Sequence, residues 1–171
     1  FHLTSNQYLG HIKNTLKQNF KKITLIEAGA GLGKTEMIKS FVKDGDKVIM
    51  VMPFTSTIKS KVEQDKDWAF SYANKKPDLD ARGLALTVDK FSHLNPMDLK
   101  ILGFKYIFID ESHLLFMSEY RPVMAKVIEL IRQLEIPVIF TTGTPVAESI
   151  FFPDLQYIKV TKDDTREKDF S

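Results

Sequence analysis

The segment best suited to chemistry is a glycine-rich stretch that ends in a lysine and a threonine. It follows an apolar run at 23–27 and reads Ala28-Gly29-Ala30-Gly31-Leu32-Gly33-Lys34-Thr35. Glycines let backbone N–H groups curl around a phosphate, and a helix that follows adds the positive end of its dipole. We expect Lys34 to reach the β- and γ-phosphates and the Thr35 hydroxyl to bind Mg²⁺. The stretch therefore predicts a site for ATP and Mg²⁺; the alternative is an unrelated glycine-rich turn.

Two adjacent carboxylates follow a second apolar run. Asp110 and Glu111 come directly after residues 106–109, and α/β sheets bind their ligands at the carboxyl ends of strands. We expect Asp110 to hold Mg²⁺, through water, opposite Thr35, and Glu111 to polarise the attacking water as a general base. An Asp-Glu pair can also simply begin a helix, so this interpretation depends on the apolar run and on the phosphate loop upstream. Lys34 and Glu111 are the predicted catalytic residues.

The elements that must position these groups alternate between short apolar runs and segments of helical spacing. The expected strands are 23–27, 47–52, 83–87, 105–110, 137–142 and 156–160, and the expected helices are 6–19, 34–43, 55–65 and 120–134. Several of the runs are apolar throughout, which is typical of strands buried on both faces. Such strands separated by helices predict an α/β fold with a mostly parallel central sheet and helices on both faces.

Composition excludes several classes of function. The chain has 171 residues, 43% of them hydrophobic and 27% charged, with a formal net charge of +2 and no cysteine. The absence of cysteine rules out disulfides, thiolate nucleophiles, Cys-ligated zinc and iron–sulfur clusters. A net charge this small does not by itself argue for nucleic acid. No run approaches the roughly 20 apolar residues of a membrane helix, so we expect a cytoplasmic protein without a membrane partner.

Taken together, the motifs resemble the first domain of superfamily 2 helicases of the DEAD/DEAH-like group. The family's first motif, A-x-x-G-x-G-K-T, matches residues 28–35, and its second motif, D-E-x-H, matches residues 110–113. Its third motif, S/T-A-T, is similar to Thr142-Gly143-Thr144, with Gly143 where alanine is usual. The resemblance implies a single RecA-like ATP-binding domain over residues 1–161. It also implies that His113 and the hydroxyls of Thr142 and Thr144 couple the ATP site to nucleic acid and to a second domain.

Weaker matches to the same family imply further contacts. Gln7 lies where the family places a glutamine that reads adenine, although it could equally be a solvated helix residue. Loop residues after two strands would contact the nucleic-acid backbone without reading bases, namely Pro53, Thr55, Ser56 and Thr87. Each of these loops could instead be purely structural. The aromatic residues at 68, 70 and 72 could stack on bases, but their spacing favours a place in the core.

The resemblance covers essentially the whole chain and leaves the activity open between related motors. Residues 162–171 are strongly charged and are expected to be a linker toward a second helicase domain, whose motifs the chain lacks. The favoured function is ATP hydrolysis coupled to nucleic-acid unwinding or translocation. Alternatives are a translocase or restriction-type motor that does not unwind, a small-molecule kinase of the phosphate-loop class, and a non-catalytic nucleic-acid-binding module. The spelling Asp-Glu-Ser-His also occurs in DNA-repair helicase relatives, which favours DNA over RNA.

Overall fold

A parallel β-sheet of eight strands organises the protein in the computed structural model. The described residues are 1–29, 31–52, 65–71, 76–116, 121–145 and 147–163. Within them the strand order is β1-β8-β2-β7-β6-β3-β5-β4, and all neighbouring strands are parallel. The strands are β1 (His2–Leu3), β2 (Ile23–Ala28), β3 (Val48–Met52), β4 (Trp68–Ser71), β5 (Gly83–Thr87), β6 (Tyr106–Asp110), β7 (Val138–Thr142) and β8 (Gln156–Lys162).

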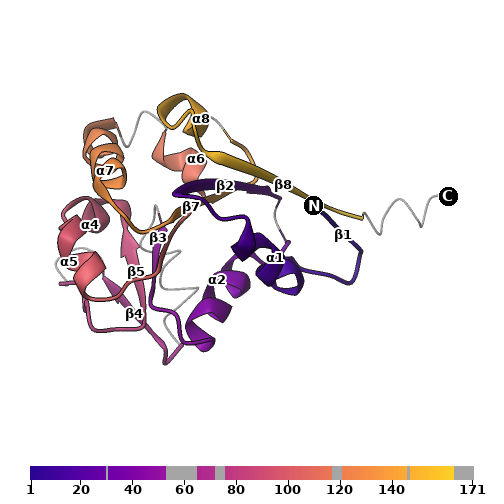
Figure 1. Ribbon diagram of the computed structural model, residues 1–171, viewed down its shortest axis with the longest axis horizontal. Helices are drawn as coiled ribbons and strands as arrows, with labels where there is room; N and C mark the ends of the chain where they lie inside the picture. Colours follow the sequence, from indigo (N-terminus) through magenta and orange to yellow (C-terminus); the bar gives the residue numbers. More distant parts are fainter. Residues whose placement is uncertain (30, 53–64, 72–75, 117–120, 146, 164–171) are drawn as a thin grey trace.

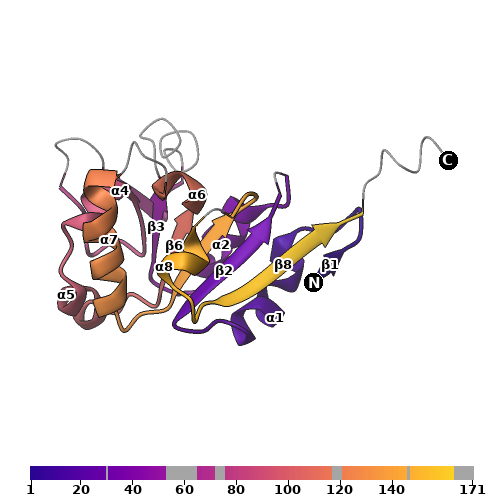
Figure 2. The ribbon, with the colours of Figure 1, turned by 90° about the horizontal axis from the view of Figure 1, so that it is seen from above.

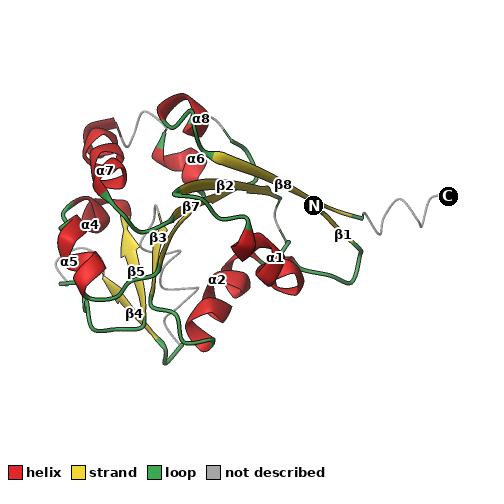
Figure 3. Cartoon of the chain, viewed as in Figure 1, coloured by secondary structure: helices red, strands yellow, loops and turns green. Residues whose placement is uncertain are grey.

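Helices cover both faces of this sheet (Figure 1). They are the 3₁₀ helix η1 (Leu9–Ile12), α1 (Lys13–Gln18), α2 (Lys34–Lys43), α4 (Val88–Ser92), α5 (Pro96–Ile101), α6 (Ser112–Leu115), α7 (Arg121–Gln133) and α8 (Glu148–Phe151). One buried cluster lies under η1, α1 and α2, and a second lies on the opposite face under α4 to α8. Figure 3 shows the alternation of helices and strands that the sequence pattern predicts. The α/β class with helices on both faces is confirmed.

The central strands are largely apolar because helices cover both faces of the sheet. Every residue of β3, β6 and β7 is buried. In β2, side chains alternate between the two clusters, since Ile26 and Ala28 pack toward α2 while Leu25 packs toward α7. A strand that buries both faces gains apolar contacts from every residue, which explains runs without polar alternation. Among the described helices, none is long and apolar enough to cross a membrane.

All six expected strands are present; the bounds of β5 agree with those expected, and the other strands differ by one or two residues at one end. The helices expected at 34–43 and 120–134 are also found, as α2 and α7, whereas most of the helix expected at 55–65 lies outside the described residues. The helix expected over 6–19 is instead divided into η1 and α1. The backbone at Ile12 (φ −110°, ψ 16°) departs from helical geometry between the two. The start of η1 is tied to the phosphate loop, because the backbone N–H of Leu9 donates to the carbonyl of Leu32 (2.9 Å).

The edge strand β4 was not expected. It carries Trp68, one of the aromatic residues considered for base stacking. Trp68 is only 6% exposed and packs in the core. Its ring lies against Gly83 of β5, where a Cβ atom would come within 2.5 Å of the indole. Trp68 is therefore a core residue, as its spacing favoured, while Phe70 is partly buried against the same cluster and Tyr72 lies outside the described residues.

Candidate functional site

Three neighbouring strands bring the predicted functional segments to one edge of the sheet. The strand β7 lies between β2 and β6, with Glu27 of β2 opposite Thr142 and Asp110 of β6 opposite Thr141. The phosphate loop follows β2, the acidic pair ends β6, and the third motif follows β7. Chain segments that are far apart in sequence therefore meet at the carboxyl ends of three adjacent parallel strands, where α/β folds place ligands. Figure 2 shows the long strand β2 beside β8 at this part of the sheet.

The phosphate loop has the backbone that its glycines permit. Gly31 and Gly33 both adopt left-handed conformations, with φ of 79° and 81°. Residues with a Cβ atom rarely adopt this geometry, so glycine is required at both positions. Gly33 is the N-cap of α2, and Lys34 and Thr35 begin that helix, where the positive end of the helix dipole favours an anion. Buried Leu32 anchors the loop in the core, and Ala30 lies outside the described residues.

The two predicted catalytic residues form an ion pair. The Nζ atom of Lys34 lies 3.2 Å from Oε1 of Glu111, and the side chains are 11% and 33% exposed. The pair joins the start of α2 to the end of β6 across the intervening strand β7. This contact places the cation expected to bind phosphate and the carboxylate expected to polarise water at one spot.

Asp110 is held rigidly below this pair. It is 1% exposed, and its Oδ1 atom accepts hydrogen bonds from the Thr141 hydroxyl (2.8 Å) and from the backbone N–H of Glu111 (3.0 Å). Two donors on one oxygen fix the orientation of the carboxylate. Oriented carboxylates and hydroxyls suit Mg²⁺, which takes few protein ligands and keeps waters and substrate phosphates around it. The described residues contain no cluster of three or more acidic or histidine side chains that would form an all-protein metal cage.

The backbone at Glu111 is strained. Its φ of 51° and ψ of 46° lie in the left-handed region, and it is the sole described residue other than glycine with a positive φ. Such a conformation costs on the order of 1 kcal/mol or more and persists where the surroundings enforce it. Next to it, the buried Ser112 hydroxyl donates to Oε1 of Glu148 (3.0 Å), which is 1% exposed at the start of α8. The turn after β6 is thereby tied to the segment after β7.

His113 joins the second and third motifs directly. Its Nδ1 atom shares a hydrogen bond with Oγ1 of Thr142 (2.7 Å) and lies 3.5 Å from Oε2 of Glu111. The same threonine hydroxyl accepts from the backbone N–H of Thr144 (3.1 Å). Gly143 lies against the phosphate loop, because a Cβ atom there would be 3.4 Å from the Ala28 carbonyl. His113 thus contacts both Thr142 and Glu111, whereas Thr144 contributes a backbone group.

A cleft of about 600 Å³ opens beside the phosphate loop. Its lining comes from η1 and its N-cap, from the loop, and from the first turn of α2: Tyr8, Gly10, His11, Gly31, Gly33, Glu36 and Met37. Gln7, predicted to read adenine, is not in this lining; its Oε1 accepts from the backbone N–H of Thr4 (3.1 Å). Tyr8 and His11 belong to no motif in the sequence, and only their proximity to Gln7 could have indicated a place in this cleft.

The expected nucleic-acid contacts are only partly within the described residues. Thr87 ends β5, and its hydroxyl accepts from the backbone N–H of Lys90 (3.4 Å) as the N-cap of α4. This hydrogen bond gives Thr87 a structural role at the start of α4. The contact of Thr87 with nucleic acid stays a prediction. The other predicted positions, Pro53, Thr55 and Ser56, lie outside the described residues.

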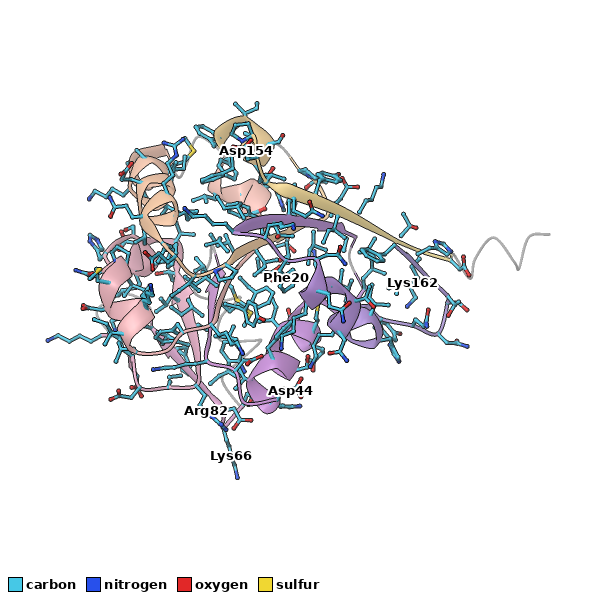
Figure 4. The ribbon with its side chains drawn as sticks, in the orientation of Figure 1. Phe20, Asp44, Lys66, Arg82, Asp154 and Lys162 are labelled. Carbon is cyan, nitrogen blue, oxygen red and sulfur yellow. The ribbon has the colours of Figure 1, made fainter. Side chains whose placement is uncertain are left out.

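The two arginines whose side chains the structure describes lie at the opposite edge of the sheet. Arg82 precedes β5, and Figure 4 labels it beside Lys66 at one end of the molecule. Arg132 lies near the end of α7 and donates to the Phe151 carbonyl (3.3 Å), just before β8. Both positions are at the amino ends of strands. Within the described part of the chain, the positive charge at the phosphate loop therefore comes from Lys34 and not from arginine.

Comparison with known proteins shows the fold. No protein-family model matches the sequence, and a search of curated proteins finds no match. Among 116 matching chains of solved structures is a hypothetical ATP-dependent RNA helicase from Sulfolobus tokodaii, with a TM-score of 0.59 at 18% sequence identity. The similarity covers 91% of this chain and 52% of that one, so this chain spans about half the length of the helicase. The two proteins share a RecA-like fold.

Proposed function

We propose that this chain is the ATP-binding motor domain of a helicase-like ATPase, which couples ATP hydrolysis to unwinding of nucleic acid or movement along it. The observation that carries the proposal is the 3.2 Å contact between Lys34 and Glu111, with buried Asp110 next to them at the carboxyl edge of the sheet. A glycine-rich turn without a role in phosphate binding gives no reason for a lysine and two carboxylates to meet at this point. The shared fold with a helicase supports the same class of activity.

The residues have separate roles in this proposal. The loop from Ala28 to Gly33 surrounds the phosphates with backbone N–H groups, and Lys34 binds the β- and γ-phosphates. Thr35 and Asp110 hold Mg²⁺, which neutralises negative charge on the phosphates. Glu111 orients and deprotonates the attacking water.

The cleft beside the loop is the proposed place of the base. Tyr8 offers an aromatic surface there, and His11 lies next to it. Gln7 orders the turn that carries Tyr8 through its hydrogen bond to Thr4, so we propose that it acts on adenine indirectly.

His113, Thr142 and Thr144 are the proposed link from the ATP site to the nucleic acid. Their hydrogen bonds join the two segments after β6 and β7, so a change at Glu111 reaches the loop after β7. Nucleic acid would lie across the strand ends and contact residues 53–56 and Thr87, with DNA favoured over RNA by the Asp-Glu-Ser-His spelling. We expect the protein to act in the cytoplasm.

The proposal includes a second domain, joined through the charged residues that follow β8; the expected linker at 162–171 therefore begins after Lys162, which still belongs to the sheet. Phosphoryl transfer to water is accelerated by an arginine that meets the developing charge, often by about 10³ to 10⁵. The described arginines Arg82 and Arg132 are at the other edge of the sheet, so we propose that this arginine comes from the second domain. The chain alone should then bind ATP but hydrolyse it slowly.

Equilibrium binding of a fluorescent ATP analogue with Mg²⁺ tests the nucleotide site. Lys34→Ala should weaken binding about tenfold or more, because a charge-assisted contact to phosphate is lost. Lys43→Ala, in the last turn of the same helix and exposed, is the matched control and should leave affinity unchanged. Equal affinities of wild type and Lys34→Ala would refute the assignment.

Fluorescence anisotropy with unrelated DNA and RNA oligonucleotides tests the partner. Contacts to the phosphate backbone should give weak binding without sequence preference and a log–log salt slope of roughly −0.9 per phosphate contact on duplex DNA. Strong preference for one sequence would contradict backbone contacts. Tighter binding of RNA than of DNA would reverse the proposed choice of nucleic acid.

A further inference from the structure

The aromatic ring at the cleft is held by a cation from the last strand of the sheet. The Nζ atom of Lys162 lies 3.6 Å from the centroid of the Tyr8 ring, within the range of a cation–π contact. Lys162 ends β8, and Figure 4 labels it on the side of the molecule where β8 and β1 meet. In the described part of the chain, Lys162 forms no ion pair. Its ammonium is directed to the ring.

The side chain of Tyr8 is open to solvent on one side. It is 47% exposed, and an exposed aromatic side chain has rotamer freedom that binding would have to remove. Two neighbours define its position on the protein side. The ring of His11 stacks beside it at 6.3 Å between centroids, and a Cβ atom at Gly33 would lie 3.3 Å from the Tyr8 Cβ.

The ring is thus placed between the phosphate loop and the lysine. Tyr8 lines the cleft together with Gly33, whereas Lys162 is absent from the cleft lining. The lysine contacts the ring and is not part of the cleft lining, so Tyr8 is the group that joins it to the cleft. The backbone around it is firm, since Lys162 pairs with Leu3 in the sheet and the N–H of Asp163 donates to the Leu3 carbonyl (3.0 Å).

We propose that Lys162 is a positioning residue for the nucleotide base: it fixes the Tyr8 ring against the phosphate loop so that the ring is ready to stack on the base. This inference rests on the proposed nucleotide site. A ring that is already ordered loses less conformational entropy when a base stacks on it, which strengthens binding of any ligand that carries a base. The same contact connects the occupied cleft to the end of β8, where the chain leaves the sheet.

A ligand series separates this role from a direct contact with phosphate. Lys162→Met keeps the length of the side chain and removes its charge. It should weaken ATP, ADP and AMP by the same factor, about two- to tenfold, and leave inorganic tripolyphosphate unaffected. Lys162→Arg keeps a cation over the ring and should restore the affinity. Lys159→Met is the matched control, because Lys159 lies on the other face of β8 with Glu27 (3.5 Å).

A second variant tests the path through the ring. In a Tyr8→Ala background, Lys162→Met should have no further effect on ATP affinity, because the group through which it acts is gone. Unchanged ATP affinity in Lys162→Met would overturn the inference, and so would equal weakening of tripolyphosphate and ATP. If wild type binds no ATP, both this inference and the proposed function fail. If Lys34→Ala abolishes binding and Lys162→Met does not alter it, only this inference fails.

Discussion

Lys34 and Glu111 neutralise each other across the edge of the sheet, with 3.2 Å between Nζ and Oε1. A triphosphate bound in the loop would present its own negative charge to the same ammonium. The carboxylate and the phosphate therefore compete for Lys34, and release of Glu111 from the lysine would make it available to a water molecule. The ion pair thus connects phosphate binding to the freedom of the proposed general base.

Glu111→Gln should separate ATP binding from hydrolysis. The amide keeps the shape of the side chain but loses the negative charge that pairs with Lys34. ATP affinity should therefore rise about two- to fivefold, which corresponds to the free energy of a partly exposed ion pair. Hydrolysis should fall by about 10² to 10⁴, because the general base is lost. Titration with a fluorescent ATP analogue and a phosphate-release assay measure the two effects.

The control is Glu129→Gln, an exposed carboxylate on α7 that accepts a hydrogen bond from Gln133. It should change neither quantity. Weaker ATP binding by Glu111→Gln would show that Glu111 supports phosphate binding and does not compete with it.

His113 and Thr142 should be energetically coupled. Their hydrogen bond of 2.7 Å is partly buried, and such a bond contributes about 1 kcal/mol to stability. A double-mutant cycle of His113→Ala and Thr142→Val, followed by urea unfolding, should show this coupling energy. The cycle is needed because Thr142→Val also removes the acceptor for the N–H of Thr144.

A second cycle of Thr142→Val with Gln133→Ala provides the comparison. Gln133 ends α7, before β7 begins, while Thr142 is the last residue of β7. Their effects on the free energy of unfolding should add. If the effects of His113→Ala and Thr142→Val on the free energy of unfolding are additive, the second and third motifs are not directly coupled through this hydrogen bond.

The phosphate loop and the acidic pair could be predicted because each is a contiguous motif next to an apolar run. Their meeting could be expected only in general terms, since the contact between Lys34 and Glu111 depends on β7 lying between β2 and β6. Chain order does not reveal that order of strands. The pairing of Ser112 with buried Glu148 could not be predicted either, because a single glutamate after residues 142–145 forms no pattern with the motif before it.

The first expected helix shows a different limit. Helical spacing over 6–19 favoured one continuous helix with Gln7 on it, but spacing does not register that the Leu9 N–H bonds to Leu32. The extended backbone at Tyr8 (φ −130°, ψ 170°) delays the start of the helix to Leu9, and Ile12 (φ −110°, ψ 16°) separates η1 from α1. Tyr8 and His11 line the cleft in place of Gln7. Such backbone details leave no trace in local periodicity.

Gly83→Ala should destabilise the fold. A Cβ atom there would come within 2.5 Å of the Trp68 ring, and both residues are in strands, so either β4 or the indole must shift. Overpacking of this kind costs about 1–3 kcal/mol. Urea unfolding measures the loss, and Gly10→Ala is the control, because nothing lies within 4 Å of the added atom and its φ is not positive. Equal stability of Gly83→Ala and wild type would mean that the edge strand β4 can shift without loss of unfolding free energy.

Tyr157 should make stability fall at alkaline pH. Its hydroxyl donates a hydrogen bond to the Glu27 carboxylate, which, with burial and the negative charges of Glu27 and Glu148, raises the pKa of Tyr157 to about 12. The phenol of an unfolded chain has a pKa of about 10. Below pH of about 10 both states keep the proton and the stabilisation is complete; between about 10 and about 12 the unfolded state loses its proton first, so the stabilisation declines.

The Tyr157→Phe variant removes this titration and should therefore show a shallower loss of unfolding free energy than wild type over that pH interval. Glu27→Gln should flatten the same slope, because the neutral amide no longer holds the phenolic proton. It also removes the ion-pair partner of Lys159 (3.5 Å), so Tyr157→Phe is the variant that isolates the phenol. Urea unfolding at several values between about pH 9 and about pH 12 measures the slopes of both variants against wild type, and deprotonation of lysines cancels in the difference between wild type and Tyr157→Phe. Parallel pH profiles of wild type and Tyr157→Phe would show that the hydrogen bond to Glu27 does not hold the phenol in its protonated form.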